Sequence, residues 1–422
     1  MNITNKKASD HKNDSILKLV VISDMHVWDK GKNKEVGSWL KMGQPEDIPN
    51  QHPIIGLLDR IKEEEIKADY LLCCGDLADK ANPKALIYAW EQVIKLKKAI
   101  SAKQVFATSG NHDVDSRYKY NDYDAKGTLQ SLVPLFPIEI EPLNDKYWAK
   151  NYVIIDNHNC RFVILNSSAY HGQGKVSDET PPEYLHGRVS KRTILSLEHD
   201  LRLKGNSKIV NILLCHHHPH KHNDIELDDY SEMTEGSRLL EILGCGKYGR
   251  WVIIHGHKHH PRLCYAAGGS SAPIIFSAGS LCAKLYPEQQ AHARNQFYVI
   301  EFPYGNFSNL GLEIAGRFKS WDWIPGDGWQ VADNRSGLPG LGGFGYRTEI
   351  SIVAERIYEL LVQNDKPFCE WEYILGKIPQ LDFLFPKDKN LLVETLQNKH
   401  QLEILTSTIG SIKQIGKGKK NI

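Results

Sequence analysis

Short apolar runs alternate with amphipathic stretches along the first part of this chain. Five of these runs are strand-length and mostly aliphatic or aromatic, which is typical of buried strands. They lie at residues 17–22, 70–74, 105–107, 209–215 and 251–254. Intervening stretches, such as residues 53–61, place apolar side chains at helical spacing opposite charged ones. This alternation of strands and helices predicts an α/β sandwich.

Each of the five runs ends in residues that bind metal ions. In chain order the ends read Ser-Asp-Met-His from Ser23, Gly-Asp from Gly75, Gly-Asn-His-Asp from Gly110, His-His-His from His216 and Gly-His-Lys-His from Gly256. Because open α/β sheets bind ligands beyond the carboxyl ends of their strands, all these ends can meet in one crevice. Imidazole and carboxylate together accept manganese, iron and zinc. The sequence therefore predicts a site for divalent cations.

The spacing within two of these ends supports a shared site. Asp24 and His26 lie two residues apart, as do His257 and His259, and on extended backbone this spacing puts both side chains on one face. A single carboxylate such as Asp76 can bridge two cations. Two cations roughly 3.5–4 Å apart can bind the attacking and non-bridging oxygens of a phosphoester. The residues thus suit a dinuclear site for phosphoester chemistry.

The bulk composition argues against several classes of protein. The 422 residues are 41% hydrophobic and 24% charged with a formal net charge of +1, which does not favour non-specific coating of nucleic acid, although local basic patches stay open. Residues 1–15 lack the apolar segment of a secretory signal, and no apolar run approaches the roughly 20 residues that span a bilayer. The 8 cysteines form no CxxC pair, so we expect free thiols. We therefore expect a cytoplasmic protein with no membrane association.

The ordered motifs Asp-x-His, Gly-Asp, Gly-Asn-His-Asp, His and Gly-His-x-His resemble those of the calcineurin-like metallophosphoesterase family. The resemblance covers about residues 17–260. It implies a four-layer α/β/β/α sandwich, which we place in residues 1–320, and two divalent metal ions with a hydroxide between them as nucleophile. It also implies the ligands: Asp24, His26 and His259 for the first metal, Asn111, His217 and His257 for the second, and Asp76 as the bridge. Of manganese, iron and zinc, we favour manganese.

The resemblance also implies two catalytic residues. His112 is similar to the family's histidine that protonates the leaving oxygen or steadies the phosphate charge. Asp79 matches the carboxylate that orients that histidine. Within the histidine run, the family ligand usually lies two residues before the proline, which selects His217, and strand alternation would send His216 the other way. His216 stays the alternative ligand.

Two departures from the motifs of phosphoprotein phosphatases bear on the substrate. Those enzymes often show arginine where this chain has Lys80, and lysine lacks the bidentate guanidinium fork. They also favour glutamate at the position of Asp113. Both departures point towards the branch that holds class III cyclic-nucleotide phosphodiesterases and nucleases.

The character of the chain changes after Trp321. Residues 321–346 are rich in aromatic and turn residues, with many glycines near their end, and we expect a linker or wrapped loop there. Residues 347–422 have the pattern of a mainly helical C-terminal region, which can cover the site, mediate dimerisation or bind a protein partner. Packing is the favoured role of Trp321, Trp323 and Trp329, and stacking on a base is the alternative.

These observations favour a phosphodiesterase that acts on a nucleotide or another small phosphodiester. A DNA or RNA nuclease subunit would use the same chemistry on nucleic acid, and a monoesterase would differ only in its pocket walls. Those walls come from loops such as residues 27–51 and 170–185. A metal-binding scaffold that has lost catalysis is disfavoured, because it has no need of His112 and Asp79.

Overall fold

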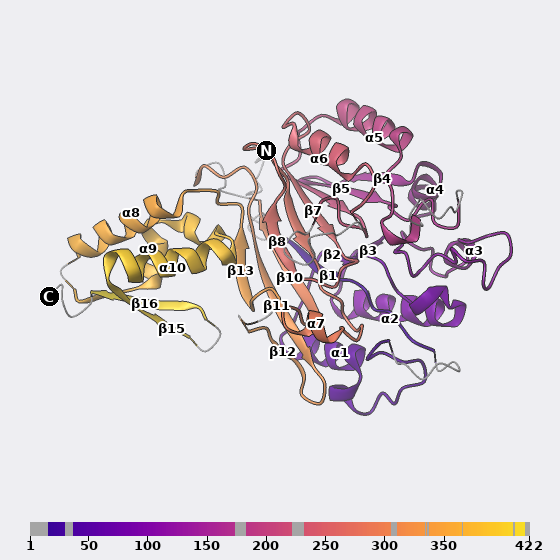
Figure 1. Ribbon diagram of the computed structural model, residues 1–422, viewed down its shortest axis with the longest axis horizontal. Helices are drawn as coiled ribbons and strands as arrows, with labels where there is room; N and C mark the ends of the chain where they lie inside the picture. The colour runs from indigo at the N-terminus through magenta and orange to yellow at the C-terminus, as the bar shows by residue number, and fades with distance from the viewer. Residues whose placement is uncertain are drawn as a thin grey trace, which may run out of the picture.

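Two sheets pack face to face in the computed structural model, with helices on both outer faces (Figure 1). The structure describes residues 16–29, 37–173, 183–221, 232–304, 310–333, 335, 337–364, 366–407 and 410–417. The layers confirm the four-layer α/β/β/α sandwich expected from the sequence. No helix within these ranges is both long and apolar enough to cross a membrane.

The first sheet has the strand order β12-β11-β10-β1-β2-β3, and β13 also pairs with β11. Its strands are β1 (Ile16–Ile22), β2 (Tyr70–Cys73), β3 (Gln104–Ala107), β10 (Gln296–Pro303), β11 (Gly316–Ile324), β12 (Gly328–Val331) and β13 (Leu341–Phe344). Strands β1, β2 and β3 are parallel, whereas β10 pairs with β1 in antiparallel register, with Leu19 opposite Ile300. The three parallel strands therefore deliver their carboxyl ends to one edge.

The second sheet has the order β4-β5-β6-β7-β9-β8. Its strands are β4 (Tyr152–Asp156), β5 (Cys160–Leu165), β6 (Val210–Leu214), β7 (Trp251–His255), β9 (Ile274–Ser277) and β8 (Arg262–Tyr265). Strands β5, β6, β7 and β9 are parallel, and β4 and β8 join the two ends in antiparallel orientation. This sheet also presents a row of parallel carboxyl ends.

The apolar residues of β1 alternate between two cores. Leu19 and Val21 join the core between the sheets, together with Phe162 and Ile212 of the second sheet. Val20 points to the opposite face and joins the core under helices α1 (Pro53–Glu63) and α2 (Pro83–Ala99). Helices α5 (Lys191–Lys204) and α6 (Gly236–Gly244) cover the outer face of the second sheet in the same way. Burial on both faces explains why the parallel strands are continuously apolar.

Residues 321–346, where we expected a linker or wrapped loop, contain the end of β11 and all of β12 and β13. The indole rings of Trp321 and Trp329 lie 4.6 and 5.0 Å from the ring of Phe297, and both are buried beside α1. The glycines that suggested a loop serve close packing. A Cβ at Gly343 in β13 would overlap the backbone of Asp382.

The C-terminal unit contains more strand than its sequence pattern indicated. Its elements are α8 (Ile350–Gln363), β14 (Phe368–Glu370), α9 (Trp371–Lys377), a 3-10 helix (Pro379–Phe383), α10 (Pro386–His400), β15 (Leu402–Thr406) and β16 (Ile412–Lys417). Helices dominate, as expected, but a three-stranded antiparallel sheet β14-β16-β15 completes the unit. It has its own core around Ile357, Ile374 and Leu396. In Figure 1 it lies beside β11 and β13.

Candidate metal centre

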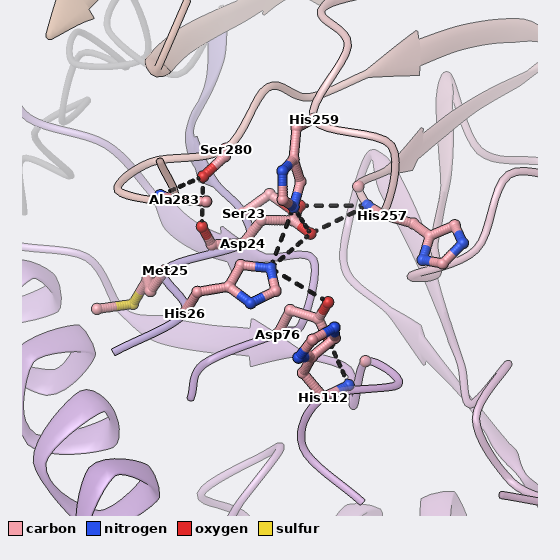
Figure 2. Close-up of polar contacts among 12 residues, drawn as sticks. Ser23, Asp24, Met25, His26, Asp76, His112, His257, His259, Ser280 and Ala283 are labelled. Atoms are coloured by element: carbon pink, nitrogen blue, oxygen red, sulfur yellow. Dashed lines mark hydrogen bonds and ion pairs between the residues drawn. The ribbon is translucent and has the colours of Figure 1, made fainter. Parts of the chain in front are cut away.

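The carboxyl ends of five strands from both sheets meet at one place. Asp24 and His26 follow β1, Asp76 follows β2, and Asn111 and His112 lie in the loop after β3. The second sheet adds the histidine run after β6 and the residues His257 and His259 after β7. Figure 2 shows how several of these side chains converge. The structure thus brings together the strand ends that the sequence predicted to meet.

The first ligand group consists of Asp24, His26 and His259. The Nε2 atom of His259 lies 3.3 Å from Asp24 Oδ1 and 3.1 Å from His26 Nε2. The Oδ2 atom of Asp76 lies 3.4 Å from His26 Nε2. Zinc ligands of these types sit roughly 2.0–2.2 Å from their ion, so ligand atoms around one ion lie roughly 3–3.5 Å apart. These residues therefore fit around a single cation.

The second ligand group surrounds the side-chain oxygen of Asn111. This Oδ1 atom lies 3.0 Å from His216 Nε2 and 3.0 Å from His257 Nδ1. His216 Nε2 is also 3.3 Å from Asp76 Oδ2. The same carboxylate oxygen of Asp76 therefore faces both groups. An oxygen atom in this position could bind two cations at once.

The histidine run places His216, rather than His217, against Asp76 and Asn111. His216 Nδ1 lies 2.8 Å from the carbonyl oxygen of Cys74, to which it can donate, which leaves the Nε2 lone pair free to bind a cation. We expected His217, because the family ligand usually lies two residues before the proline and because strand alternation was expected to turn His216 away. In the structure, Leu214 belongs to the core between the sheets and alternation from Leu214 puts His216 on that same face. The expected alternation assumed the opposite face of β6, and the choice between the two histidines stays a prediction.

His217 remains close to the second group. Its ring centroid is 4.5 Å from that of His257, and ligand nitrogens of His216, His217 and His257 lie within 4.8 Å of one another. His217 Nδ1 is 2.8 Å from the Ser167 hydroxyl oxygen. Its buried Nε2 atom has no hydrogen-bond partner among the described residues. A cation would satisfy this nitrogen, so His217 stays a candidate ligand beside His216.

Most ligands have a left-handed backbone rather than the extended one that the two-residue spacing suggested. The φ angles are 52° at Asp24, 45° at His26, 52° at Asp76, 80° at His257 and 54° at His259. Strands β1 and β7 end before these residues, so strand alternation does not orient them. Residues other than glycine in this region carry strain of about 1–3 kcal/mol each, and such residues cluster at functional sites.

Two glycines allow the ligand loops to approach one another. A Cβ at Gly110 would overlap the carboxylate of Asp76, and a Cβ at Gly256 would overlap the carboxylate of Asp24 and the hydroxyl of Ser23. The motifs Gly-Asn-His-Asp and Gly-His-x-His therefore need glycine for space. Any larger residue would push the strand ends apart.

Hydrogen bonds hold the ligand loops in place. The hydroxyl of Ser23 donates to Asp24 Oδ2, and the backbone N–H of His257 donates to the same carboxylate at 3.2 Å. The Ser280 hydroxyl donates to the Asp24 carbonyl at 2.6 Å and accepts from the Ala283 N–H at 2.7 Å (Figure 2). Sequence motifs did not identify Ser280, which lies 256 residues after Asp24 along the chain.

Asp113 connects two of the loops. Its carboxylate accepts from the backbone N–H of Leu77 at 2.7 Å, of Ala78 at 3.3 Å and of Gly110 at 2.8 Å. Burial, together with the nearby Asp76 charge, raises the pKa of Asp113 to about 7. Asp113 therefore ties the loop after β2 to the loop after β3.

His112 and Asp79 form the expected pair at the rim of the site. His112 Nδ1 lies 3.3 Å from Asp79 Oδ1, and the two rings of His112 and His26 are 4.6 Å apart. Burial lowers the pKa of His112, but the carboxylates of Asp76 and Asp79 outweigh burial and raise it above its ordinary value. The position suits a proton donor that faces both the ligands and the solvent.

The electrostatics of the site favour bound cations. Burial raises the pKa of Asp76, but His216, His112 and His26 outweigh burial and hold it far below the ordinary value. Burial lowers the pKa of His216, but the charges of Asp76 and Asp24 raise it to about 9. The buried carboxylates of this site are thus strongly stabilised by nearby positive charge, and the buried Nε2 atom of His217 has no hydrogen-bond partner among the described residues. Both features fit a pair of divalent ions.

Residues 17–261 match the family model described as calcineurin-like phosphoesterase, and because the match covers more than half of the chain, the chain belongs to this family. Membership implies a metal-dependent phosphoesterase. Residues 342–398 match a second model, described as wHTH-Calcineurin_assc. From α8 to β16, a span that extends beyond the matched residues, the order helix, strand, helix, helix, strand, strand is that of a winged helix-turn-helix unit. A comparison with curated proteins found no match.

The solved structures that this chain resembles are distant in sequence. A purple acid phosphatase (PPD1) from yellow lupin seeds is 16% identical, with a TM-score of 0.45 over 76% of this chain and 53% of that one. GAP50, an anchor in the inner membrane complex of Plasmodium, is 12% identical, with a TM-score of 0.42 over 79% and 90%. The phosphopantetheinyl hydrolase of Mycobacterium tuberculosis is 13% identical, with a TM-score of 0.33 over 63% and 90%. The chain spans about half the length of the lupin enzyme.

Proposed function

We propose that this protein is a dinuclear-metal-dependent phosphodiesterase that hydrolyses a nucleotide or another small phosphodiester. One observation carries the proposal: Asp76 Oδ2 lies 3.4 Å from His26 in the first ligand group and 3.3 Å from His216 in the second. This geometry supports two adjoining cations that share one carboxylate. When bound, such ions lower the pKa of a water molecule towards 7 and polarise the phosphoryl oxygens.

The residues of the chain supply the remaining chemistry. Asp24, His26 and His259 would hold one ion, Asn111, His216 or His217, and His257 would hold the other, and Asp76 would bridge them. His112 would give a proton to the leaving oxygen, and Asp79 would fix the orientation of its ring. Because the ligands are carboxylates, an amide and imidazoles, with no thiolate, manganese is the favoured metal.

The choice of a diester rests on Lys80. This residue stands where many phosphoprotein phosphatases have arginine, its side chain is 61% exposed, and its ammonium lies 3.9 Å from Asp79. A lysine at the rim does not offer the planar fork that binds a phosphomonoester dianion in bidentate fashion. Parts of the expected pocket walls, residues 30–36 and 174–182, lie outside the described residues. A cytoplasmic location stays a prediction.

A nuclease is the second candidate, because residues 342–398 match a winged helix-turn-helix model. Units of this kind can place a recognition helix in the major groove of DNA. A scaffold that has lost catalysis is less well supported, since His112 and Asp79 lie in contact at 3.3 Å. The C-terminal unit is also the proposed contact for a protein partner or a second copy.

A metal-supplemented substrate screen tests the proposal. The purified protein, loaded with manganese, iron or zinc, is assayed on bis-p-nitrophenyl phosphate, cyclic nucleotides, p-nitrophenyl phosphate and single- and double-stranded nucleic acid. We expect turnover of small diesters and its loss in an Asp76→Asn control. Failure on every small diester with both metals bound, as measured by elemental analysis, refutes the proposal. Cleavage confined to nucleic acid would establish the nuclease instead.

A further inference from the structure

A cavity of about 950 Å³ lies between the sandwich and the C-terminal unit. The sandwich contributes residues of β8, β11 and β13, and the C-terminal unit contributes residues of α9, α10 and the turn before β16. Figure 1 shows α10 and β13 on the two sides of this boundary. Small-molecule sites have volumes of roughly 300–1,000 Å³ and occur preferentially at such domain boundaries.

Aromatic side chains line one part of the cavity. The rings of Tyr265 in β8 and Phe385, just before α10, lie 4.4 Å apart, and both residues line the cavity together with Trp371. Phe385 and Trp371 are almost fully buried. The guanidinium of Arg347 also lies 4.8 Å from the centroid of the Tyr265 ring, so the lining offers apolar surface rather than an open ring face.

Three lysines line the cavity as well: Lys319 from β11, and Lys387 and Lys389 from α10. The side chains of these lysines form no hydrogen bond or ion pair with any residue in the described ranges. Two acidic residues of the lining are already paired, Glu301 with Lys18 at 2.8 Å and Asp382 with Arg317 at 2.6 Å. Asp388 and Glu394 also line the cavity, so the unpaired lysines exceed the unpaired carboxylates by one.

The position of Lys389 destabilises the ligand-free protein. It lies in the first turn of α10, where the helix dipole disfavours a positive charge. Lys389 is half-buried, and burial lowers the pKa of its ammonium although the nearby Asp382 carboxylate opposes this shift. A bound anion would compensate both effects. Charged side chains in positions that lower the stability of the ligand-free protein are typical of binding sites.

The arrangement of the winged-helix unit favours a small molecule, rather than a DNA duplex, as the ligand of this cavity. Helix α10 takes the place of the recognition helix, and its residues Lys387, Asn390, Leu391 and Glu394 line the cavity, as does Ser411 near the tip of the wing. In DNA-binding relatives of this motif the same helix enters a major groove about 12 Å wide. Here residues of that helix line a cavity of about 950 Å³ together with residues of β11 and β13, a volume that suits a small molecule.

We propose that this cavity is a second ligand site, distinct from the metal centre, for an organic phosphate of about mononucleotide size. Its phosphate would lie at Lys389 and its aromatic or apolar part against Tyr265 and Phe385. Pro261, which lines the cavity, follows the proposed ligand His259 by two residues and leads into β8.

Calorimetric titration of the full-length protein with AMP, phenyl phosphate and inorganic phosphate tests the proposal. We expect saturable binding of AMP or phenyl phosphate, and weaker binding of inorganic phosphate, in both the wild type and the Asp76→Asn variant. Lys389→Met should weaken binding by at least about tenfold, since a charge-assisted hydrogen bond is lost. Lys399→Met is the matched control, because Lys399 is on the same helix but pairs with Glu355 away from the cavity lining.

A second variant and a second readout keep the test independent of folding defects. Leu391→Trp, at a half-exposed residue of the lining, should fill the cavity and abolish binding without loss of the helical spectrum. Lys389→Met should raise the melting temperature of the ligand-free protein while it weakens binding. Binding that disappears in Asp76→Asn but survives both cavity variants would overturn the proposal, as would no binding of any probe. Duplex DNA binding lost in Lys389→Met would overturn it in favour of a nucleic-acid reader.

Discussion

At the scale of single residues, the metal centre depends on which nitrogen or oxygen atom faces the shared position. Asp76 uses one carboxylate oxygen towards both groups and the other to accept the N–H of His112 at 2.7 Å. His216 uses one ring nitrogen for the Cys74 carbonyl and the other for the site. In each of these two residues, one side-chain atom makes a hydrogen bond that fixes the orientation of the side chain. The other oxygen or nitrogen atom then points into the site, as is usual for metal ligands.

The two adjacent histidines give a sharp prediction. We expect His216→Ala to lower the bound metal from two equivalents towards one and to reduce diester turnover by at least about 100-fold, because it removes an atom in contact with Asp76 and Asn111. His217→Ala should have the smaller effect on both. Elemental analysis after desalting, together with turnover, provides the measurement. The opposite ranking would restore His217 as the principal ligand.

The His112–Asp79 pair can be separated from metal binding. Asp79→Asn should leave two metals bound and lower kcat by about 10–100-fold, since the carboxylate orients the proton donor and binds no metal in the proposed scheme. In combination with His112→Ala the loss should be less than the sum of the single losses, because both variants remove one function. Additive losses in this double-mutant cycle would show that Asp79 acts independently of His112.

At the scale of elements, strand β11 carries a buried carboxylate that should make stability depend on pH. Asp322 is 5% exposed and accepts from Gln296 Nε2 at 2.6 Å. Burial raises the pKa of Asp322 to about 6, although the hydrogen bond from Gln296 opposes this shift. The folded protein therefore binds a proton more tightly than the unfolded chain does. Its stabilising contribution is present below about pH 4 and is lost as the pH rises to about 6.

We expect Asp322→Asn to remove the loss of stability that Asp322 causes as the pH rises. The variant should be more stable than the wild type by about 2–3 kcal/mol at pH 7, provided that the amide oxygen keeps the bond from Gln296, and the difference should vanish near pH 4. Denaturant unfolding at a series of pH values gives the free energies. A constant difference between variant and wild type across the series would contradict the assignment.

The elements also show what sequence reasoning could predict. Apolar runs such as residues 17–22 identify strands because both of their faces are buried, and the glycine-bearing motifs identify the ends of strands. Local patterns could not predict β12 and β13. Gly342 and Gly343 suggested a turn, but they lie in β13 and are needed there because that strand packs closely against Phe318 and Asp382. They could not separate His216 from His217 either, since that depends on which face of β6 meets the other sheet.

At the scale of the whole molecule, the metal centre spans both sheets. Asp24 and His26 come from the first sheet and His259 from the second, 233 residues after His26 along the chain. Cations bound there would stabilise the packing of one sheet on the other. The strands of the C-terminal unit, by contrast, contribute to no ligand group among the described residues.

Metal removal should therefore destabilise the whole sandwich. Dialysis against a chelator should lower the melting temperature by several degrees, because binding at 100 times the dissociation constant contributes about 2.7 kcal/mol. Re-addition of manganese should restore it. Asp76→Asn should show little of this metal-dependent shift, and an equal shift in that variant would mean that the stabilising ions bind elsewhere. Differential scanning calorimetry gives the comparison.

The antiparallel pairing of β1 with β10 has a consequence for synthesis on the ribosome. Strand β1 is complete at residue 22, yet its partner on one side begins only at residue 296. Until β10 has emerged, the nascent chain carries an unpaired strand edge at the centre of its future sheet, and such edges promote association with other chains. The protein should consequently need protection from aggregation late in translation, after every proposed ligand has already been made.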